Sequence, residues 1–294
     1  MTSPRLTITE PALSLPPPPT WVTRRRAESL EEAAFLSGAA LSHLHLLTTH
    51  AAVPQALLRE RLALRAAEVC VIHSGRPERA PDLRDAVNLL RAGDLPGPAG
   101  EIFLAWRQAV ERPVSVAALH RAMPDHTPEV LAQWLDSGQG APVTRAACVI
   151  EAVRAQAPRA TVTALILADA TLAQALGWKH LTPLLALGLT RADLRLSGAE
   201  LHLACHRALS AAALDAARQA TDLTPRVSHL QAVAPKLRAK GAAQAVALFL
   251  SRDALAPTAL PLPNRAARRL CDRLVQLGAI RELTGRDTFR LYGV

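Results

Sequence analysis

Apolar residues recur along most of this chain at intervals of three and four, and proline or glycine separates one such stretch from the next. This spacing is typical of amphipathic helices. It predicts a first helix from Ser29 to about His50, because Ser29 and Glu32 match the capping box that satisfies free amides at a helix start. A second helix is expected from Pro54 to Gly75.

The same pattern continues, with varied spacing, through the middle of the chain. Further helices are expected after Pro81, after Pro98, after Ser115, after Thr127-Pro128, after Pro142, from Thr161 to Leu176, near Pro183, from Gly198 to Ala220 and from Thr224 to Ala234. No fixed period of the kind found in helical repeat proteins relates them. The sequence therefore predicts a mainly α fold, with a multi-helix bundle domain over residues 28–235.

The first twenty residues break this pattern, because they carry six prolines, four of them consecutive from Pro16 to Pro19. Proline lacks a backbone amide proton and does not fit the interior of a helix or of a central strand. Residues 1–27 are therefore predicted to form a flexible or polyproline-like tail.

The pattern changes again in the last thirty-one residues. A helix predicted to start at the N-cap Asn264 has an apolar face made of Ala267, Leu270, Cys271 and Leu274. Its other side carries Arg265, Arg268, Arg269 and Arg273. Gly278 is expected just past the end of this helix, where a left-handed backbone suits glycine.

A β-hairpin is predicted after this helix. Its strands would run from Ala279 to Thr284 and from Thr288 to Tyr292, around a turn at Gly285-Arg286. Phe289 and Leu291 are expected to share one face of the second strand, because they are two residues apart.

A helix followed by a hairpin is the order of a winged helix-turn-helix, which we predict for residues 236–294. An earlier helix is expected from Ala242 to Leu255. The segment from Ala256 to Pro263 holds three prolines and leaves room for one irregular turn only.

Charge is concentrated in this last module. The chain has a net charge of +9, and +7 of it falls from Lys236 onward. A concentrated positive field stabilises a nearby polyanion, so double-stranded DNA is the first partner to consider. Arg265, Arg268 and Arg269 are predicted to lie nearest the bases, and Arg273, Arg286 and Arg290 on phosphates.

Three other interpretations are open at this stage. The arginines of the helix can form an ordinary solvated face, partly paired with Asp272 and Glu282. The chain can be a helical scaffold whose winged helix binds a protein partner. A protein partner or a second copy of the chain can also bind through the helical domain. It can also be an enzyme of unrecognised type, although phosphate-loop, serine-elbow and zinc-protease motifs are missing from the sequence. We expect a non-enzymatic protein.

The remaining candidate chemistry is weak, and neither a metal ion nor a cofactor is implied. His202, Cys205 and His206 share one helix face, but histidine and cysteine in such a helix are more often partly buried than metal-bound. Asp85 and Asp169 interrupt apolar helices, so each needs a partner, for which a hydrogen bond between helices is the simplest explanation. Asp82 is interpreted in the same way.

The chain is also predicted to be a cytoplasmic protein. Its four cysteines are far apart and lie in apolar helices, as expected for buried reduced thiols. No signal peptide or membrane-spanning segment is evident, since the longest uncharged apolar run, Ala160 to Ala168, is far too short to span a bilayer.

Three segments resemble members of a bacterial family known as domain of unknown function 1403. They are Gly93 to Gly100, Val233 to Gly241, and the run from Arg265 through Thr288 to Gly293. This resemblance implies a domain plan and no particular activity. The C-terminal segment also resembles winged-helix modules that bacteria append to Fic-type transferases, but the catalytic H-x-F-x-x-G-N-G-R signature of those enzymes is missing from the sequence, so their chemistry is not implied.

Overall fold

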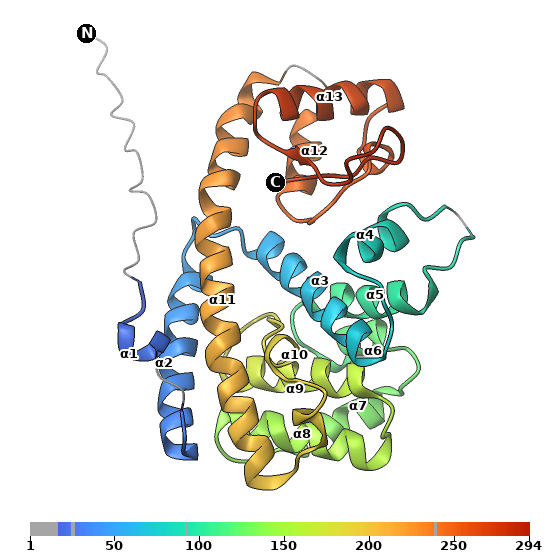
Figure 1. Cartoon of the computed structure of the whole chain (residues 1–294). Coiled ribbons are helices and arrows are strands. Elements are labelled where there is room, and N and C mark those ends of the chain that lie inside the picture. Colours follow the sequence, from blue (N-terminus) through green and yellow to red (C-terminus); the bar gives the residue numbers. More distant parts are fainter. Residues whose placement is uncertain (1–16, 25–26, 92, 238–239) are drawn as a thin grey trace.

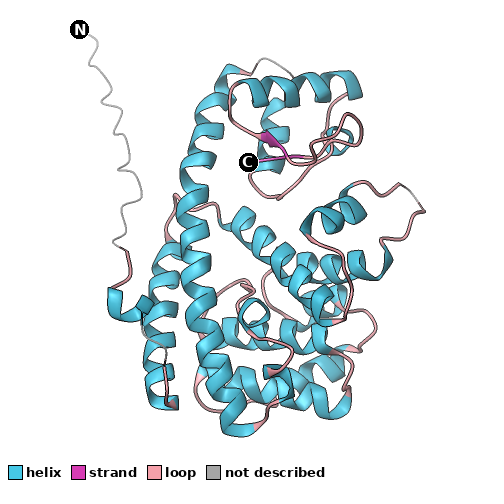
Figure 2. Cartoon of the chain, viewed as in Figure 1, coloured by secondary structure: helices cyan, strands magenta, loops and turns pink. Residues whose placement is uncertain are grey.

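The computed structural model describes residues 17–294 except 25–26, 92 and 238–239 (Figure 1). The described chain is mainly helical, as predicted, and its strands are confined to the C-terminal part (Figure 2). The α-helices are α1 Thr20–Arg24, α2 Leu30–Thr49, α3 Gln55–His73, α4 Ala80–Asn88, α5 Gly97–Glu111, α6 Val116–Ala122, α7 Pro128–Leu135, α8 Pro142–Gln156, α9 Thr161–Ala175, α10 Leu185–Gly188, α11 Gly198–Val233, α12 Ala242–Phe249 and α13 Asn264–Gln276. Short 3-10 turns η1 Asp193–Arg195, η2 Ala234–Lys236 and η3 Pro257–Ala259 and strands β1 Arg281–Glu282 and β2 Tyr292–Gly293 complete the chain.

Helix starts agree well with the local sequence signals. The hydroxyl of Ser29 accepts a hydrogen bond from the amide of Glu32 at 3.2 Å, and the Glu32 carboxylate accepts one from the amide of Glu28 at 2.9 Å. Ser115 caps α6 in the same way. These side chains satisfy amides that have no partner within the helix, so the position of each start is fixed locally.

The N-terminal tail predicted for residues 1–27 lies mostly outside the described residues. Within that range, residues 20–24 form the short helix α1, whose Trp21 stacks on Phe35 of α2 with ring centroids 5.2 Å apart.

Helices α2 and α11 lie side by side along most of the length of α2 (Figure 1). Small residues on α11, among them Ala212, Ala213 and Ala216, are buried. The pair is also joined by a buried hydrogen bond of 2.7 Å between the Ser37 hydroxyl and the Nδ1 atom of His206. Close backbone approach and a satisfied polar pair together fix how the two helices pack.

The sequence predicted two helices where the structure has the single helix α11, so the break expected near Pro225 is wrong. Pro225 lies inside α11 and cannot donate to the carbonyl one turn earlier. Buried residues on both sides of it, Leu223, Thr224, Val227 and Leu230, continue the same packed face. Tertiary packing over this length outweighs the loss of one backbone hydrogen bond.

The helix α12 ends at Phe249, six residues before the predicted Leu255. The Ser251 hydroxyl donates to the Leu248 carbonyl at 3.1 Å and helps to end the helix. The chain then turns so that Asp253 is buried and Leu255 pairs with Tyr292 in an isolated antiparallel bridge.

The predicted hairpin is present, but its paired strands are shorter and the loop between them is longer than expected. Its strands pair antiparallel, with Arg281 opposite Gly293 and Glu282 opposite Tyr292. The prediction that Phe289 and Leu291 share a face is wrong, because Leu291 is fully buried whereas Phe289 is 61% exposed. Phe289 has a left-handed backbone, with φ of 53°, and so does not continue a strand.

One hydrophobic cluster extends from the helical bundle into the C-terminal module. It includes Leu62 of α3 and Val227 of α11 together with Ala267, Leu274 and Tyr292. The two predicted domains therefore share packed side chains, and α11 connects them as a continuous helix (Figure 1).

Buried ion pairs connect the same two parts of the molecule. Asp253 is 2% exposed, and its carboxylate accepts from the Nε atoms of Arg61 at 3.1 Å and Arg84 at 2.6 Å. Arg61 also donates to the backbone oxygen of Val294. This cluster attaches the C-terminal module to α3 and α4.

A second buried acid lies close by. Glu60 of α3 pairs with Arg107 of α5 at 2.9 Å and with Arg252 at 3.5 Å. Burial raises the pKa of Glu60, and the two arginines oppose that shift. We call these two clusters, with Asp253 and Glu60 at their centres, the buried ion-pair seam.

Within the described chain, no helix combines the length and the apolar character needed to cross a membrane.

Candidate nucleic-acid interface

Helix α13 is held on the C-terminal module by the apolar face that the sequence predicted. Ala267, Leu270, Cys271 and Leu274 are all buried. Burial raises the pKa of the Cys271 thiol to about 12, so this cysteine is a packing residue and not a reactive thiolate.

The C-terminus of α13 is fixed equally firmly. Gly278 has the predicted left-handed backbone, with φ of 66°. The Gly278 amide donates to the Val275 carbonyl and the Ala279 amide to the Leu274 carbonyl, both at 2.9 Å. This is the Schellman arrangement that closes a helix end. In addition, His229 of α11 contacts the Leu277 carbonyl at 2.9 Å through its Nε2 atom.

The opposite face of α13 is exposed and basic. Arg265, Arg268, Arg269 and Arg273 are all exposed. Within the described residues, none of the four makes an ion pair or a side-chain hydrogen bond. The prediction that they lie outside the apolar face is therefore confirmed, and their partial pairing with Asp272 and Glu282 is not observed.

Arg286 and Arg290, in the loop of the hairpin, differ from the arginines of α13 because their guanidinium groups already have partners. Arg286 donates from both terminal nitrogens to the carboxylate of Asp85 in α4, each at 2.7 Å. Arg290 lies 3.7 Å from Glu282 and 3.5 Å from Asp287. The pKa of Arg286 is raised by Asp85, and that of Arg290 is raised first by a hydrogen bond with Tyr292 and then by Glu282. Neither is as available to a phosphate as the arginines of α13.

A groove of about 550 Å³ lies between the first half of α13 and the hairpin loop. Its lining residues are Leu89, Ala256, Pro257, Thr258, Asn264, Arg268, Asp272, Asp287, Thr288, Phe289, Arg290 and Tyr292. It therefore places one arginine of the exposed face of α13 beside an exposed aromatic ring. Phe289 was not predicted as a site residue from the sequence. The available signal was an aromatic residue in a turn segment between Arg286 and Arg290.

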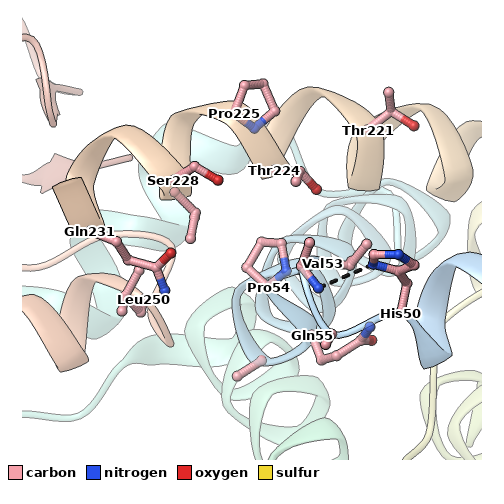
Figure 3. Close-up of a pocket in the computed structure, with 14 residues that line it drawn as sticks. His50, Val53, Pro54, Gln55, Thr221, Thr224, Pro225, Ser228, Gln231 and Leu250 are labelled. Atoms are coloured by element: carbon pink, nitrogen blue, oxygen red, sulfur yellow. Dashed lines mark hydrogen bonds between the residues drawn. The ribbon is translucent and has the colours of Figure 1, made fainter. Parts of the chain in front are cut away.

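A wider hollow of about 1200 Å³ lies where α11 passes the loop between α2 and α3 (Figure 3). Pro54, Thr224 and Gln231 are among its lining residues. His50 is the one ionisable side chain among the described residues that line it. Without a fixed charge the hollow cannot select a phosphate or a metal ion, so it is the weaker candidate site.

The acids that the sequence singled out have partners within the chain. Asp169 is buried and accepts hydrogen bonds from the amides of Leu184 and Leu185, at 3.2 and 2.9 Å, at the start of α10. Asp82 accepts from the amide of Arg79 at 2.8 Å. Asp85 pairs with Arg286 of the hairpin loop. Only Asp169 makes the expected hydrogen bonds to another helix, because Asp82 caps its own helix.

The weak zinc hypothesis for His202, Cys205 and His206 gains no support. His206 is hydrogen-bonded to Ser37. Burial raises the pKa of Cys205 to about 12. In the part of the chain that the structure describes, no three ligand-type side chains come together in a way that could hold a metal ion.

These features define a class of protein: a helical bundle with an attached helix-and-hairpin module whose helix α13 exposes four arginines without partners among the described residues. The sequence profile of the family described as protein of unknown function (DUF1403) matches residues 7–294. The chain belongs to this family, and the predicted resemblance is confirmed. No curated protein matches the chain.

Proposed function

We propose that this protein binds double-stranded DNA through the exposed face of α13. The observation that carries the proposal is the grouping of four exposed, unpartnered arginines on one helix face, whereas Arg252, Arg286 and Arg290 of the same module are paired with acids. Unpaired arginines can bind a phosphate or a base edge at little cost in free energy, because no ion pair within the protein has to be broken first.

The chain order of the module supports a winged-helix interpretation. Helix α12 is followed by the bridge residue Leu255, by the turn η3, by α13 and then by β1 and β2. The bridge from Leu255 to Tyr292 puts a third extended segment beside the hairpin. In a winged helix the helix before the hairpin enters the major groove, and the hairpin lies beside it as the wing.

The dimensions of α13 fit this role. Arg265 and Arg273 are eight residues apart, which is about 12 Å along a helix and close to the width of the major groove of B-DNA. Arg265, Arg268 and Arg269 are assigned to base edges or nearby phosphates, and Arg273 to a phosphate. Arg286 and Arg290 are assigned to holding the wing, because their partners are internal.

Titration of a short fluorescent duplex at low salt tests the proposal. The double variant Arg268→Glu and Arg269→Glu should lower duplex affinity by more than about 100-fold, because each lost arginine contact is worth about 1–3 kcal/mol and the new charges repel phosphates. Both residues are exposed and unpaired, so the free energy of unfolding should not change.

The matched control is Arg191→Glu and Arg195→Glu, which makes the same change of net charge on two exposed residues. They belong to the segment between α10 and α11, which lies at the opposite end of α11 from α13 (Figure 1). It should leave affinity within about threefold of the original, since only distant screened charges change. If both double variants lose the same duplex affinity, binding depends on the net charge of the protein and not on the exposed face of α13. If the original protein binds no duplex at low salt, the alternative of a winged helix that docks on a protein takes its place.

A further inference from the structure

Phe289 is the exposed aromatic of the C-terminal module, and its backbone is strained. Its side chain is 61% exposed, and its φ of 53° falls in the left-handed region, which a bulky residue rarely adopts. Packing against the core explains neither the exposure of this side chain nor its left-handed backbone. Strain of this kind persists only where surrounding contacts impose it, and it is often found where a side chain acts on a ligand.

The surrounding contacts can be identified. The Phe289 carbonyl accepts hydrogen bonds from the Nε and Nη2 atoms of Arg286, at 3.2 and 2.9 Å. Arg286 itself is fixed by Asp85 of α4, and the Nε atom of Arg290 donates to the Arg286 carbonyl at 3.0 Å. Before Phe289, the loop is thus attached to the helical bundle through Arg286. After Phe289, it is held by the hydrogen bond from Arg290 to the Arg286 carbonyl. The backbone that carries the exposed ring is therefore held in place by contacts within the chain.

The groove beside Phe289 has balanced charges, unlike the outer face of α13. Arg268 and Arg290 line it together with Asp272 and Asp287. Because these charges balance, the groove gives a phosphate little electrostatic binding free energy. A neutral planar group, in contrast, can stack on the Phe289 ring and form hydrogen bonds with the polar residues that line the groove. Arginine and asparagine side chains, here Arg268 and Asn264, are the usual hydrogen-bond partners of guanine and adenine edges.

We propose that this groove receives an unpaired nucleobase stacked on Phe289, next to the duplex held by α13. The inference rests on the proposed DNA binding and narrows the preferred substrate to duplex DNA with an unpaired base. The volume of about 550 Å³ lies in the range of small-molecule sites, and aromatic stacking accepts any base.

The test compares two probes that share the same base-paired sequence. One is a perfect duplex, and the other carries one additional, bulged 2-aminopurine in one strand, whose fluorescence responds to stacking. The original protein should bind the bulged probe about tenfold more tightly than the duplex, from the stacking of one base, and should change its fluorescence. Phe289→Leu should lose both the preference and the fluorescence change while its affinity for the perfect duplex is unaffected.

The matched control is Phe35→Leu, which removes a similarly exposed phenylalanine from α2. It should behave like the original protein. Equal affinity for both probes, or a preference that survives Phe289→Leu, overturns the inference and leaves DNA binding intact. Binding to neither probe overturns the proposed function itself, and with it this inference.

Discussion

The arginines of α13 and the arginines of the buried ion-pair seam have opposite environments in the same chain. On α13, the four arginines are exposed and have no ion-pair partner among the described residues. In the seam, Arg61 and Arg84 converge on Asp253, and Arg107 and Arg252 converge on Glu60. The same residue type attaches the module in one place and remains available to a partner in the other.

The difference teaches that net charge alone does not locate a binding surface. The excess of positive charge from Lys236 onward covers both regions, yet Arg252, Arg286 and Arg290 have acidic partners within the chain. Only charges without internal partners can be neutralised by a polyanion at little cost. Arg281 and Lys240 are exposed and make no ion pair with the described residues either, so the grouping of four unpaired arginines on one helix face is what identifies α13.

The largest effect is expected from breaking the seam. Asp253→Ala leaves Arg61 and Arg84 without their common carboxylate in a mostly buried place. The free energy of unfolding should fall by about 3–5 kcal/mol, as is usual when one partner of a buried ion pair is removed. Urea denaturation followed by circular dichroism measures it.

Asp287→Ala is the matched control, because Asp287 is fully exposed and lies 3.5 Å from Arg290. Exposed pairs contribute less than about 1 kcal/mol, so its unfolding curve should nearly overlay that of the original protein. Similar losses in both variants would contradict the distinction between seam and surface.

An effect that depends on pH is expected at Asp169, a buried acid held by backbone amides and not by arginine. Burial raises the pKa of Asp169 to about 7, whereas the same carboxyl in the unfolded chain has its ordinary pKa. Between about pH 4 and about pH 7 the folded protein holds a proton that the unfolded chain releases. The stabilisation is therefore complete below about pH 4 and is lost as the pH rises to about 7.

Asp169→Asn removes this titration. The difference between the unfolding free energies of the original protein and the variant should change by about 1.4 kcal/mol per pH unit in that window, with the original protein losing stability relative to the variant as the pH rises. If the difference in unfolding free energy stays constant between about pH 4 and about pH 7, Asp169 is ionised in the folded protein over that whole range. The account of a protonated buried carboxyl would then be wrong.

Much of the fold was predictable because its signals are local. Caps such as Ser29 and the Schellman glycine Gly278 act within a few residues of themselves, and the apolar face of α13 follows from helical spacing alone. The four exposed arginines were predictable for the same reason, as the complement of that face.

The errors arose where distant residues decide the local structure. Helix α11 continues through Pro225 because its packed face continues, and α12 stops early because Asp253 is drawn to Arg61 and Arg84 on other helices. The conformation of Phe289 depends on the contact of Arg286 with Asp85, two hundred and one residues earlier in the chain. Pattern analysis does not reveal pairings over such separations.

The salt dependence of duplex binding tests the central claim most directly, because it compares an unpaired arginine with a paired one. Each phosphate neutralised contributes about −0.9 to the slope of log affinity against log salt concentration. Arg273→Ala should therefore make the slope shallower by about 0.9, whereas Arg286→Ala should leave it unchanged, since Arg286 is paired with Asp85. An equal loss of slope in the two variants, or none in Arg273→Ala, would contradict the claim that the unpartnered face of α13 is the DNA-binding surface.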